Sequence, residues 1–253
     1  MIIFVTGATA GFGAAIARRF AREGHHIVAT GRRRDRLETL ADELGRDRVL
    51  PLVFDVRDQE AVETAFKTLP AAFADIDVLV NNAGLALGLD PAYQARLDDW
   101  EVMVDTNVKG LMYATRAALP GMVARNRGHI VNLGSTAAIY PYPGGNVYGA
   151  TKAFVRQFSL NLRADLLGTK IRVTDVEPGL VGGTEFSTMR FHGDSGRADK
   201  LYAGADALTP DDIAETVYWV TTLPSRVNIN AIEMMPVTQA FGPLPVHRDP
   251  SSN

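Results

Sequence analysis

The chain has 253 residues, of which 46% are hydrophobic and 22% charged, with a formal net charge of -3 and no cysteine. Such a composition is typical of one globular domain with a large core. The charge balance gives no reason to expect nucleic acid or an anionic membrane surface as a partner. The lack of cysteine excludes disulfides, thiolate metal sites and a cysteine nucleophile.

Short apolar runs alternate with longer segments of helical periodicity along the chain. We expect strands near residues 2–5, 26–30, 49–54, 77–81, 129–134, 171–176 and 231–235, and helices near 12–23, 34–44, 59–69, 99–125, 151–167 and 210–222. This alternation predicts a single α/β domain over residues 1–253. Its expected architecture is a doubly wound parallel sheet (Rossmann fold) with helices on both faces.

The first residues lead straight into a strand pattern, without a charged leader and a cleavage site. No apolar run approaches the ~18 residues of a membrane-spanning helix. We therefore expect a cytoplasmic protein without a membrane partner. The five histidines show no metal-ligand spacing, so no metal site is expected.

A glycine-rich loop follows the first strand, with the sequence Thr6-Gly7-Ala8-Thr9-Ala10-Gly11-Phe12-Gly13. At a strand-to-helix turn, backbone N–H groups and the positive helix end can hold a pyrophosphate. The spacing G-x-x-x-G-x-G differs from the common G-x-G-x-x-G, and an isolated glycine cluster is often only structural. Its place after the first strand favours a dinucleotide cofactor, with contacts expected at Gly7, Thr9, Ala10, Gly11, Phe12 and Gly13.

The second strand ends at Gly31, about where a carboxylate would bind the adenosine ribose 2'-hydroxyl of NAD. Arg32 and Arg33 follow instead, and guanidinium groups suit a 2'-phosphate. The expected cofactor is therefore NADP. The alternative is a solvated basic run at a helix start, since Arg34 and Arg36 come next.

Tyr148 lies four residues before Lys152, a spacing that puts both side chains on one helix face. A nearby ammonium can lower the pKa of a phenol from its ordinary value near ~10, so we expect Tyr148 to transfer a proton near neutral pH. Ser135 ends an apolar strand and can add a hydroxyl to the same cleft. With the glycine loop, this set predicts hydride-transfer chemistry. Alone, the Tyr148 and Lys152 pair could be an ordinary surface pair.

Two segments interrupt the alternation. Residues 178–208 are rich in glycine and mixed charge, which suggests a substrate lid, the alternative being a mobile surface insertion. The tail over residues 239–253 contains three prolines and is expected to pack on the surface or to reach a neighbouring subunit.

These motifs, in this order, resemble those of the short-chain dehydrogenase/reductase family over essentially the whole chain. Further matching elements are Asp55-Val56, Asn81-Asn82-Ala83-Gly84, Asn107 and Pro178-Gly179. The resemblance implies that Asp55 and Val56 flank the adenine, that Asn82, Ala83 and Gly84 support it, and that Asn107 holds a water chain behind Lys152. It further implies cofactor contacts at Pro178, Gly179, Val181 and Thr184. Gly182-Gly183 displaces Thr184 by one position from its place in many members. Asn107 could also be a capped-turn or buried structural asparagine, and for this residue both roles can be true together.

Residues 144–159 and 177–186 are closely similar to bacterial NADP-dependent 3-hydroxy acid dehydrogenases. This similarity implies oxidation of serine, L-allo-threonine and 3-hydroxyisobutyrate, or reduction of malonic semialdehyde, with Ser135 and Tyr148 on the substrate. It also implies a homotetramer built on the helices near 99–125 and 151–167. A carboxylate substrate requires a cation, and Arg190 is expected to bind it from the lid, although a lid arginine could also be simply solvated.

Three other functions compete with this interpretation. A short-chain carbonyl reductase of neutral ketones or aldehydes would use the same catalytic residues. A non-catalytic NADP sensor would not need Ser135, Tyr148 and Lys152 together. A sugar-nucleotide epimerase usually carries a larger C-terminal substrate domain than the 75 residues that follow Pro178 here.

Overall fold

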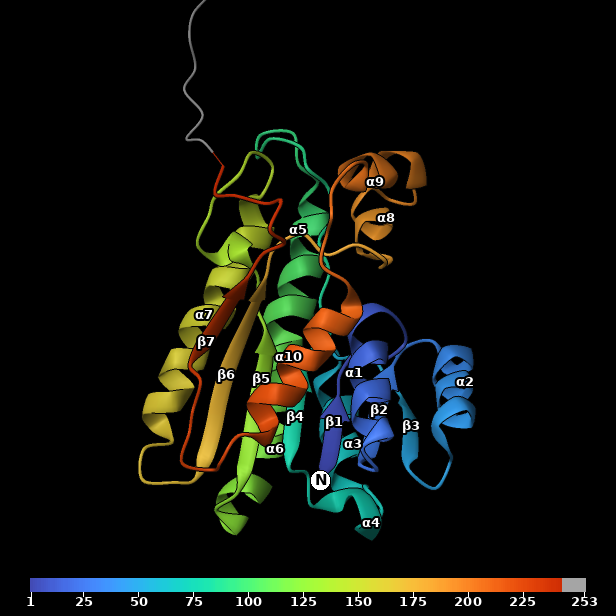
Figure 1. Cartoon of the computed structure of the whole chain (residues 1–253), viewed down its shortest axis with the longest axis vertical. Coiled ribbons are helices and arrows are strands. Elements are labelled where there is room, and N and C mark those ends of the chain that lie inside the picture. Colours follow the sequence, from blue (N-terminus) through green and yellow to red (C-terminus); the bar gives the residue numbers. More distant parts are fainter. Residues whose placement is uncertain (243–253) are drawn as a thin grey trace, which may run out of the picture.

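Within residues 1–242, seven parallel strands form one sheet in the order β3-β2-β1-β4-β5-β6-β7 (Figure 1). The strands are β1 (Ile2–Val5), β2 (His26–Gly31), β3 (Val49–Val53), β4 (Val78–Asn81), β5 (Gly128–Leu133), β6 (Ile171–Pro178) and β7 (Ala231–Met234). The computed structural model describes residues 1–242. Strand order reverses between β1 and β4, the place where open α/β sheets bind ligands at the carboxyl ends of their strands.

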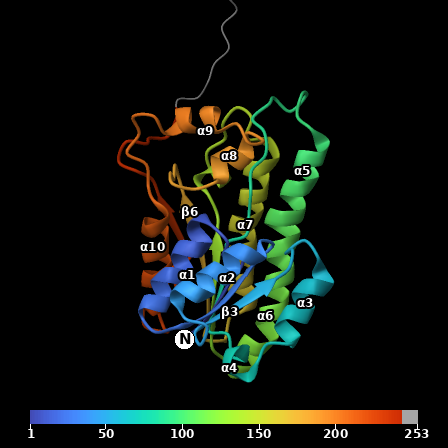
Figure 2. The ribbon, with the colours of Figure 1, turned by 90° about the vertical axis from the view of Figure 1, so that its right-hand side faces the viewer.

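Helices cover both faces of the sheet (Figure 2). One face carries α1 (Gly11–Arg22), α2 (Arg34–Leu44) and α10 (Pro210–Thr222), whose Ile16, Leu37 and Ile213 are fully buried. The other face carries α3 (Gln59–Lys67), α6 (Leu111–Arg125) and α7 (Asn146–Asp165), with α4 (Ala71–Ala74) at its lower end. This arrangement confirms the doubly wound α/β fold predicted from the sequence. Helices on both faces are expected, because both faces of a parallel sheet must be covered.

The helix predicted over 99–125 is longer and less regular than expected. It consists of α5 (Leu97–Val104), a π-helical stretch η1 (Asp105–Gly110) and α6. Such stretches are frequent at functional sites, and this one contains Asn107. The helix expected from residue 151 begins at Asn146, so Tyr148 lies in its first turn.

The start of α10 follows the sequence signal closely. Thr209 and Asp212 form a capping box, in which the Asp212 carboxylate accepts from the Thr209 backbone N–H at 2.7 Å and the Thr209 hydroxyl accepts from the Asp212 N–H at 3.3 Å. Pro210 occupies the first helical position, where no N–H is needed. Helix α4 is four residues long and had no clear periodic signal.

The segment expected as a lid is partly helical rather than irregular. It contains α8 (Phe186–Arg190) and α9 (Ser195–Tyr202), which lie above the carboxyl ends of the strands (Figure 1). The Asp194 carboxylate caps α9 by accepting from the Arg197 N–H at 2.9 Å. Short helices of five and eight residues escape detection by periodicity because they complete too few turns.

The C-terminal tail is described only to residue 242, and its residues 243–253 lie outside the described part. The Gln239 side-chain oxygen accepts from the Leu180 N–H at 2.7 Å. The Phe241 ring centre lies 4.7 Å from that of Tyr140. The start of the tail therefore packs on its own chain. Within residues 1–242, no helix has the length and apolarity needed to span a bilayer.

Candidate active site

The glycine loop between β1 and α1 forms the floor of a groove. Gly7 and Gly11 have φ values of +71° and +52°, which residues with a side chain rarely adopt. A Cβ on residue 13 would collide with the Gly7 carbonyl oxygen. Among the described residues, no side chain caps α1, so the N–H groups of its first turn remain available to an anion.

Asn82 and Ala83 hold this loop in place from the end of β4. The Asn82 side-chain amide donates to the carbonyl oxygens of Thr6 and Gly7 at 2.8 and 3.0 Å. The Thr6 hydroxyl accepts from the backbone N–H groups of Asn82 and Ala83, both at 3.0 Å. These bonds fix the loop against the neighbouring strand, so Asn82 acts on the loop backbone as well as lining the groove.

The groove encloses about 300 Å³ and gathers nearly all of the expected cofactor residues. It is lined by Gly7, Thr9, Ala10, Gly11, Phe12, Arg32, Arg33, Asp55, Val56, Asn82, Ala83, Gly84, Tyr148, Lys152 and Thr184. Pro178, Gly179 and Val181 line an adjoining cavity of about 580 Å³, which shares Phe12, Tyr148 and Thr184 with the groove. A third cavity, of about 620 Å³, lies on the outer side of the glycine loop and contains none of Ser135, Tyr148 and Lys152.

Arg33 lines the groove just after the end of β2. Its guanidinium donates to the Thr9 hydroxyl at 2.9 Å and to the Glu185 carboxylate at 2.7 Å. Glu185 immediately precedes α8 and also pairs with Arg36 at 3.3 Å. Arg32 is more exposed and lies 3.8 Å from Asp55. No local pattern indicates Glu185, because this carboxylate reaches Arg33 across 152 residues.

Ser135 and Tyr148 both line the adjoining cavity of about 580 Å³, and Tyr148 also lines the groove. Ser135 follows β5 and caps a short 3-10 turn, its hydroxyl accepting from the Ala137 N–H at 3.1 Å. Tyr148 is buried, and its ring packs edge to face on Phe186 with centres 5.8 Å apart. Phe186 was not predicted as a site residue, because only the folding of residues 178–208 brings its ring against Tyr148.

The electrostatics of Tyr148 differ from the sequence-based expectation. Burial raises the pKa of Tyr148 to about 12, against the effect of a hydrogen bond with Ser135, which lowers it. The Lys152 ammonium lies 5.8 Å from the Tyr148 ring centre and donates to the Leu133 carbonyl oxygen at 2.7 Å. The pKa of Tyr148 thus moves opposite to the predicted lowering, because desolvation of the phenolate dominates, and the groups that lower this pKa are Ser135 and Arg190.

Asn107 is fully engaged in hydrogen bonds. Its side-chain amide donates to the Leu85 carbonyl oxygen at 2.8 Å and to the Thr151 hydroxyl at 3.0 Å, and its oxygen accepts from the Leu85 N–H at 2.9 Å. A Cβ on Gly84 would lie 3.3 Å from the Asn107 side-chain oxygen and 3.7 Å from the Lys152 ammonium. Asn107 therefore joins the strand end to α7 next to Lys152, and its structural role is evident.

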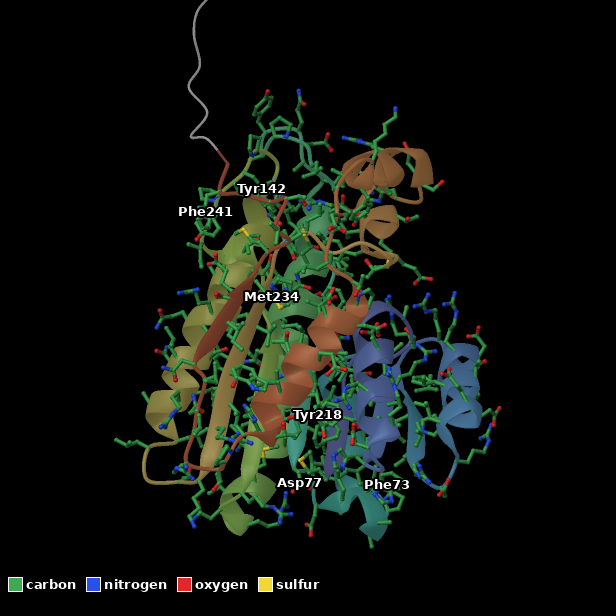
Figure 3. All side chains as sticks on the ribbon, viewed as in Figure 1. Phe73, Asp77, Tyr142, Tyr218, Met234 and Phe241 are labelled. Atoms are coloured by element: carbon green, nitrogen blue, oxygen red, sulfur yellow. The ribbon has the colours of Figure 1, made fainter. Side chains whose placement is uncertain are left out.

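Arg190 extends from α8 to line the cavity of about 580 Å³ that adjoins the groove. Its guanidinium donates to the Tyr142 hydroxyl at 2.6 Å and to the Gly88 carbonyl oxygen at 3.3 Å. The guanidinium carbon lies 5.3 Å from the Tyr142 ring centre and 5.5 Å from that of Tyr148. Figure 3 shows Tyr142 and Phe241 at the lid end of the molecule, with Phe73 and Asp77 at the opposite end. Tyr142 was not predicted as a site residue.

This combination of a doubly wound sheet, a glycine loop and a Ser, Tyr and Lys set is that of a nucleotide-dependent dehydrogenase. A family model described as short chain dehydrogenase matches residues 1–194, and the chain belongs to this family.

Individual relatives are similar over almost the whole chain. The NADP-dependent 3-hydroxy acid dehydrogenase YdfG of Salmonella typhi is 66% identical, covering 98% of this chain and 100% of its own. Serine 3-dehydrogenase of Agrobacterium fabrum is 53% identical, with 98% of both chains covered. A solved structure, the closed form of serine dehydrogenase complexed with NADP+, matches with a TM-score of 0.97 at 63% identity, covering 98% of this chain and 100% of that one. The predicted family is confirmed, and these names agree with the predicted NADP-dependent oxidation of 3-hydroxy acids.

Proposed function

We propose that the protein is an NADP-dependent oxidoreductase of 3-hydroxy acids. It oxidises the hydroxyl of serine, L-allo-threonine or 3-hydroxyisobutyrate, or reduces a matching semialdehyde. The observation that carries this proposal is the short distance between a proton-transferring group and a cation in one cavity. Tyr148 lies at the cofactor groove, and the Arg190 guanidinium lies 5.5 Å from the Tyr148 ring centre. A substrate with a carboxylate and a hydroxyl a few bonds apart fits such a site.

The residues present fit NADP. Gly7 and Gly13 let the loop pack tightly against its own backbone and Asn82, and the uncapped positive end of α1 beside it favours the charge of a pyrophosphate. Arg33 directs a guanidinium into the adenosine end of the groove, where the end of β2 offers Gly31 and no carboxylate. A 2'-phosphate would therefore meet the Arg33 guanidinium, where it would compete with the Glu185 carboxylate that now accepts from Arg33.

When bound, NADP accepts a hydride from the carbon that bears the hydroxyl. Tyr148 takes the hydroxyl proton in this direction, and in reduction it returns a proton to the carbonyl oxygen. Ser135 orients the substrate oxygen by a hydrogen bond, and the Lys152 ammonium stabilises the phenolate form of Tyr148. Burial raises the pKa of Tyr148 to about 12. Proton transfer near neutral pH therefore requires that the phenolate be stabilised in the site when cofactor and substrate are bound.

Arg190 is the proposed partner of the substrate carboxylate. Its bonds to Tyr142 and Gly88 hold the guanidinium in one orientation, so little side-chain freedom is lost when an anion binds. Gly88 and Arg190 are also joined through their backbones, by a bond of 2.9 Å from the Gly88 N–H to the Arg190 carbonyl oxygen. The lid therefore meets the loop after β4 at the residue proposed to bind substrate.

The proposal is tested by comparing Arg190→Ala with the unmodified enzyme on acid and neutral alcohols. Loss of a charge-assisted bond of ~1.5 to 3 kcal/mol should lower kcat/KM for serine or 3-hydroxyisobutyrate by roughly 10- to 100-fold, while neutral alcohols change little. An unchanged ratio would favour a carbonyl reductase of neutral substrates. NADPH binding without turnover of any substrate in the panel would favour a sensor.

We further propose a cytoplasmic homotetramer. The exposed apolar side chains Val104, Met112, Val123 and Leu160 lie on α5, α6 and α7, where the family resemblance implies subunit contacts. Isologous packing of such faces leads to a closed point group. Light scattering at micromolar concentration tests this assembly, and a monomer would contradict it. The cytoplasm is the proposed location because the reaction draws on the NADP(H) pool of the cell.

A further inference from the structure

Two carboxyl groups are buried together behind Lys152. Asp175 and Glu177 are alternate residues of β6, so their side chains project from the same face of the sheet, the face that α7 covers. Each residue is only 1% exposed. The Glu177 carboxylate accepts from Arg156 on α7, with both oxygens 2.6 Å from the same guanidinium nitrogen. Among the described residues, neither carboxyl oxygen of Asp175 finds a hydrogen-bond donor.

Asp175 lies directly beneath the backbone that holds the catalytic groups. Its carboxyl packs against Gly134, where a Cβ would lie 2.9 Å from Asp175 Oδ2 and even closer to Oδ1. Gly134 stands between Leu133, whose carbonyl oxygen accepts from the Lys152 ammonium, and Ser135. Only glycine at position 134 lets the carboxyl approach this closely. Asp175 thus packs against the residue that separates Ser135 from the Leu133 carbonyl oxygen to which Lys152 donates.

The hydrogen bonding of Asp175 and Glu177 is satisfied only if the two carboxyl groups hold one proton between them. Two buried carboxylates repel each other, and a buried carboxylate without a donor is costly to maintain. A proton on Asp175 removes the repulsion and turns the orphaned carboxyl into a donor for its neighbour Glu177. In agreement, burial and then the charge of Glu177 raise the pKa of Asp175 to about 7.

We propose that Asp175 and Glu177 share one proton, and that Asp175 is a positioning residue whose negative charge, gained when this proton leaves for solvent, keeps Lys152 an ammonium. The charged groups facing Asp175 are Lys152 and Arg156 from α7 and Glu177 from its own strand. Glu233, which is in register with Glu177 on β7, is bound by the Tyr140 hydroxyl at 3.1 Å. Burial lowers the pKa of Lys152 to about 8, and the charge of Asp175 acts against this lowering.

The inference rests on the proposed function only for its kinetic test, which uses Asp175→Asn. The amide keeps the shape of the side chain and a donor for Glu177, but it cannot become negative. Reduction requires the Tyr148 and Lys152 pair to retain its protons, so removing a nearby negative charge should move the alkaline limb of kcat for NADPH-dependent reduction of malonic semialdehyde to lower pH, by roughly one unit. An unchanged limb would overturn the proposal.

Two control variants separate charge from structure. Ser159→Ala removes another buried polar group of α7, one that donates to Val155 and accepts from Asn132, and it should leave the pH profile unmoved. Glu177→Gln removes the acidic neighbour while Asp175 can still ionise, so its alkaline limb should stay at that of the unmodified enzyme. A shift in Ser159→Ala as large as that in Asp175→Asn would reduce the effect to packing and contradict the proposal.

Infrared spectroscopy tests the shared proton without any turnover. The unmodified protein should show a protonated carboxyl absorption that disappears as pH rises through about 7, the pKa of Asp175, and Asp175→Asn should lack it. Absence of that absorption from the unmodified protein would overturn the proposal. This readout also decides the question if no hydroxy acid proves to be a substrate, so failure of the proposed function would not be confused with failure of this inference.

Discussion

The Arg190 guanidinium donates to the Tyr142 hydroxyl at 2.6 Å, joining the lid helix α8 to the loop that leads into α7. The same guanidinium lies over the Tyr148 ring. Tyr142 therefore sets the direction in which Arg190 presents its charge to the cavity. A residue of this kind affects binding of a carboxylate without touching the reacting atoms.

We expect Tyr142→Phe to raise KM for serine or 3-hydroxyisobutyrate by roughly 10- to 30-fold, with a smaller change in kcat. The variant keeps the ring but loses one hydrogen bond to a charged group, of ~1.5 kcal/mol or somewhat more. Tyr140→Phe is the matched control, because its hydroxyl lines the same cavity but binds Glu233 and not Arg190. Equal losses in both variants would argue against a specific role for Tyr142.

Tyr148→Phe should lower kcat by at least ~100-fold and leave NADPH binding nearly unchanged. The ring still packs on Phe186, but the transferable proton is gone. Ser135→Ala should cause a smaller loss, because one orienting hydrogen bond is removed rather than the proton. Steady-state rates and NADPH fluorescence titrations measure both quantities. A loss of only a few-fold in Tyr148→Phe would mean that another acid transfers the proton.

Replacing Arg33 by Ala should raise KM for NADP by roughly 10-fold or more and affect KM for NAD far less. The guanidinium that meets a 2'-phosphate is lost, whereas NAD carries no such group. Arg46→Ala is a suitable control, since Arg46 pairs with Glu38 and Asp42 on the surface of α2 and does not line the groove. Parallel losses for the two cofactors would contradict the assignment of Arg33 to the phosphate.

His129 on β5 should make the fold sensitive to acid. Its Nε2 lies 2.8 Å from the Thr174 hydroxyl, which itself donates to the Ile229 carbonyl oxygen, so Nε2 carries the proton of a neutral ring. Burial, followed by the charge of Arg172, lowers the pKa of His129 to about 3. The folded state therefore stays unprotonated while the unfolded state, with a pKa of 6.5, gains a proton.

This difference makes the free energy of unfolding fall as pH decreases from about 6.5 to about 3, by at most ~1.4 kcal/mol per pH unit from this one group. Above pH 6.5 the ring is neutral in both the folded and the unfolded state, so this group no longer changes the free energy of unfolding with pH. His129→Gln keeps a donor for Thr174 but does not titrate, so its dependence on pH should be flatter. Urea unfolding at fixed protein concentration over this pH range measures the slopes. Identical slopes would show that His129 does not titrate differently on unfolding.

The sequence alone determined the features that arise from neighbouring residues. Alternating apolar runs predicted the parallel sheet, and Thr209, Pro210 and Asp212 marked the start of α10 to the residue. The glycine loop followed β1 as expected, because its spacing and its two positive-φ glycines encode a local turn. The four-residue spacing of Tyr148 and Lys152 holds on α7 for the same reason.

Only the tertiary structure decided the contacts between distant segments. The bonds of Arg33 to Glu185 and of Arg190 to Tyr142 join residues 152 and 48 positions apart, and they depend on how the lid settles on the strand ends. The pKa of Tyr148 depends on burial, which spacing does not reveal. Asp175 looks like an ordinary charged residue in the sequence, and it becomes a buried acid behind Lys152 only through the register of β5 with β6. Local geometry follows from the pattern of neighbouring residues, whereas burial and long-range pairing arise from the packing of the whole domain.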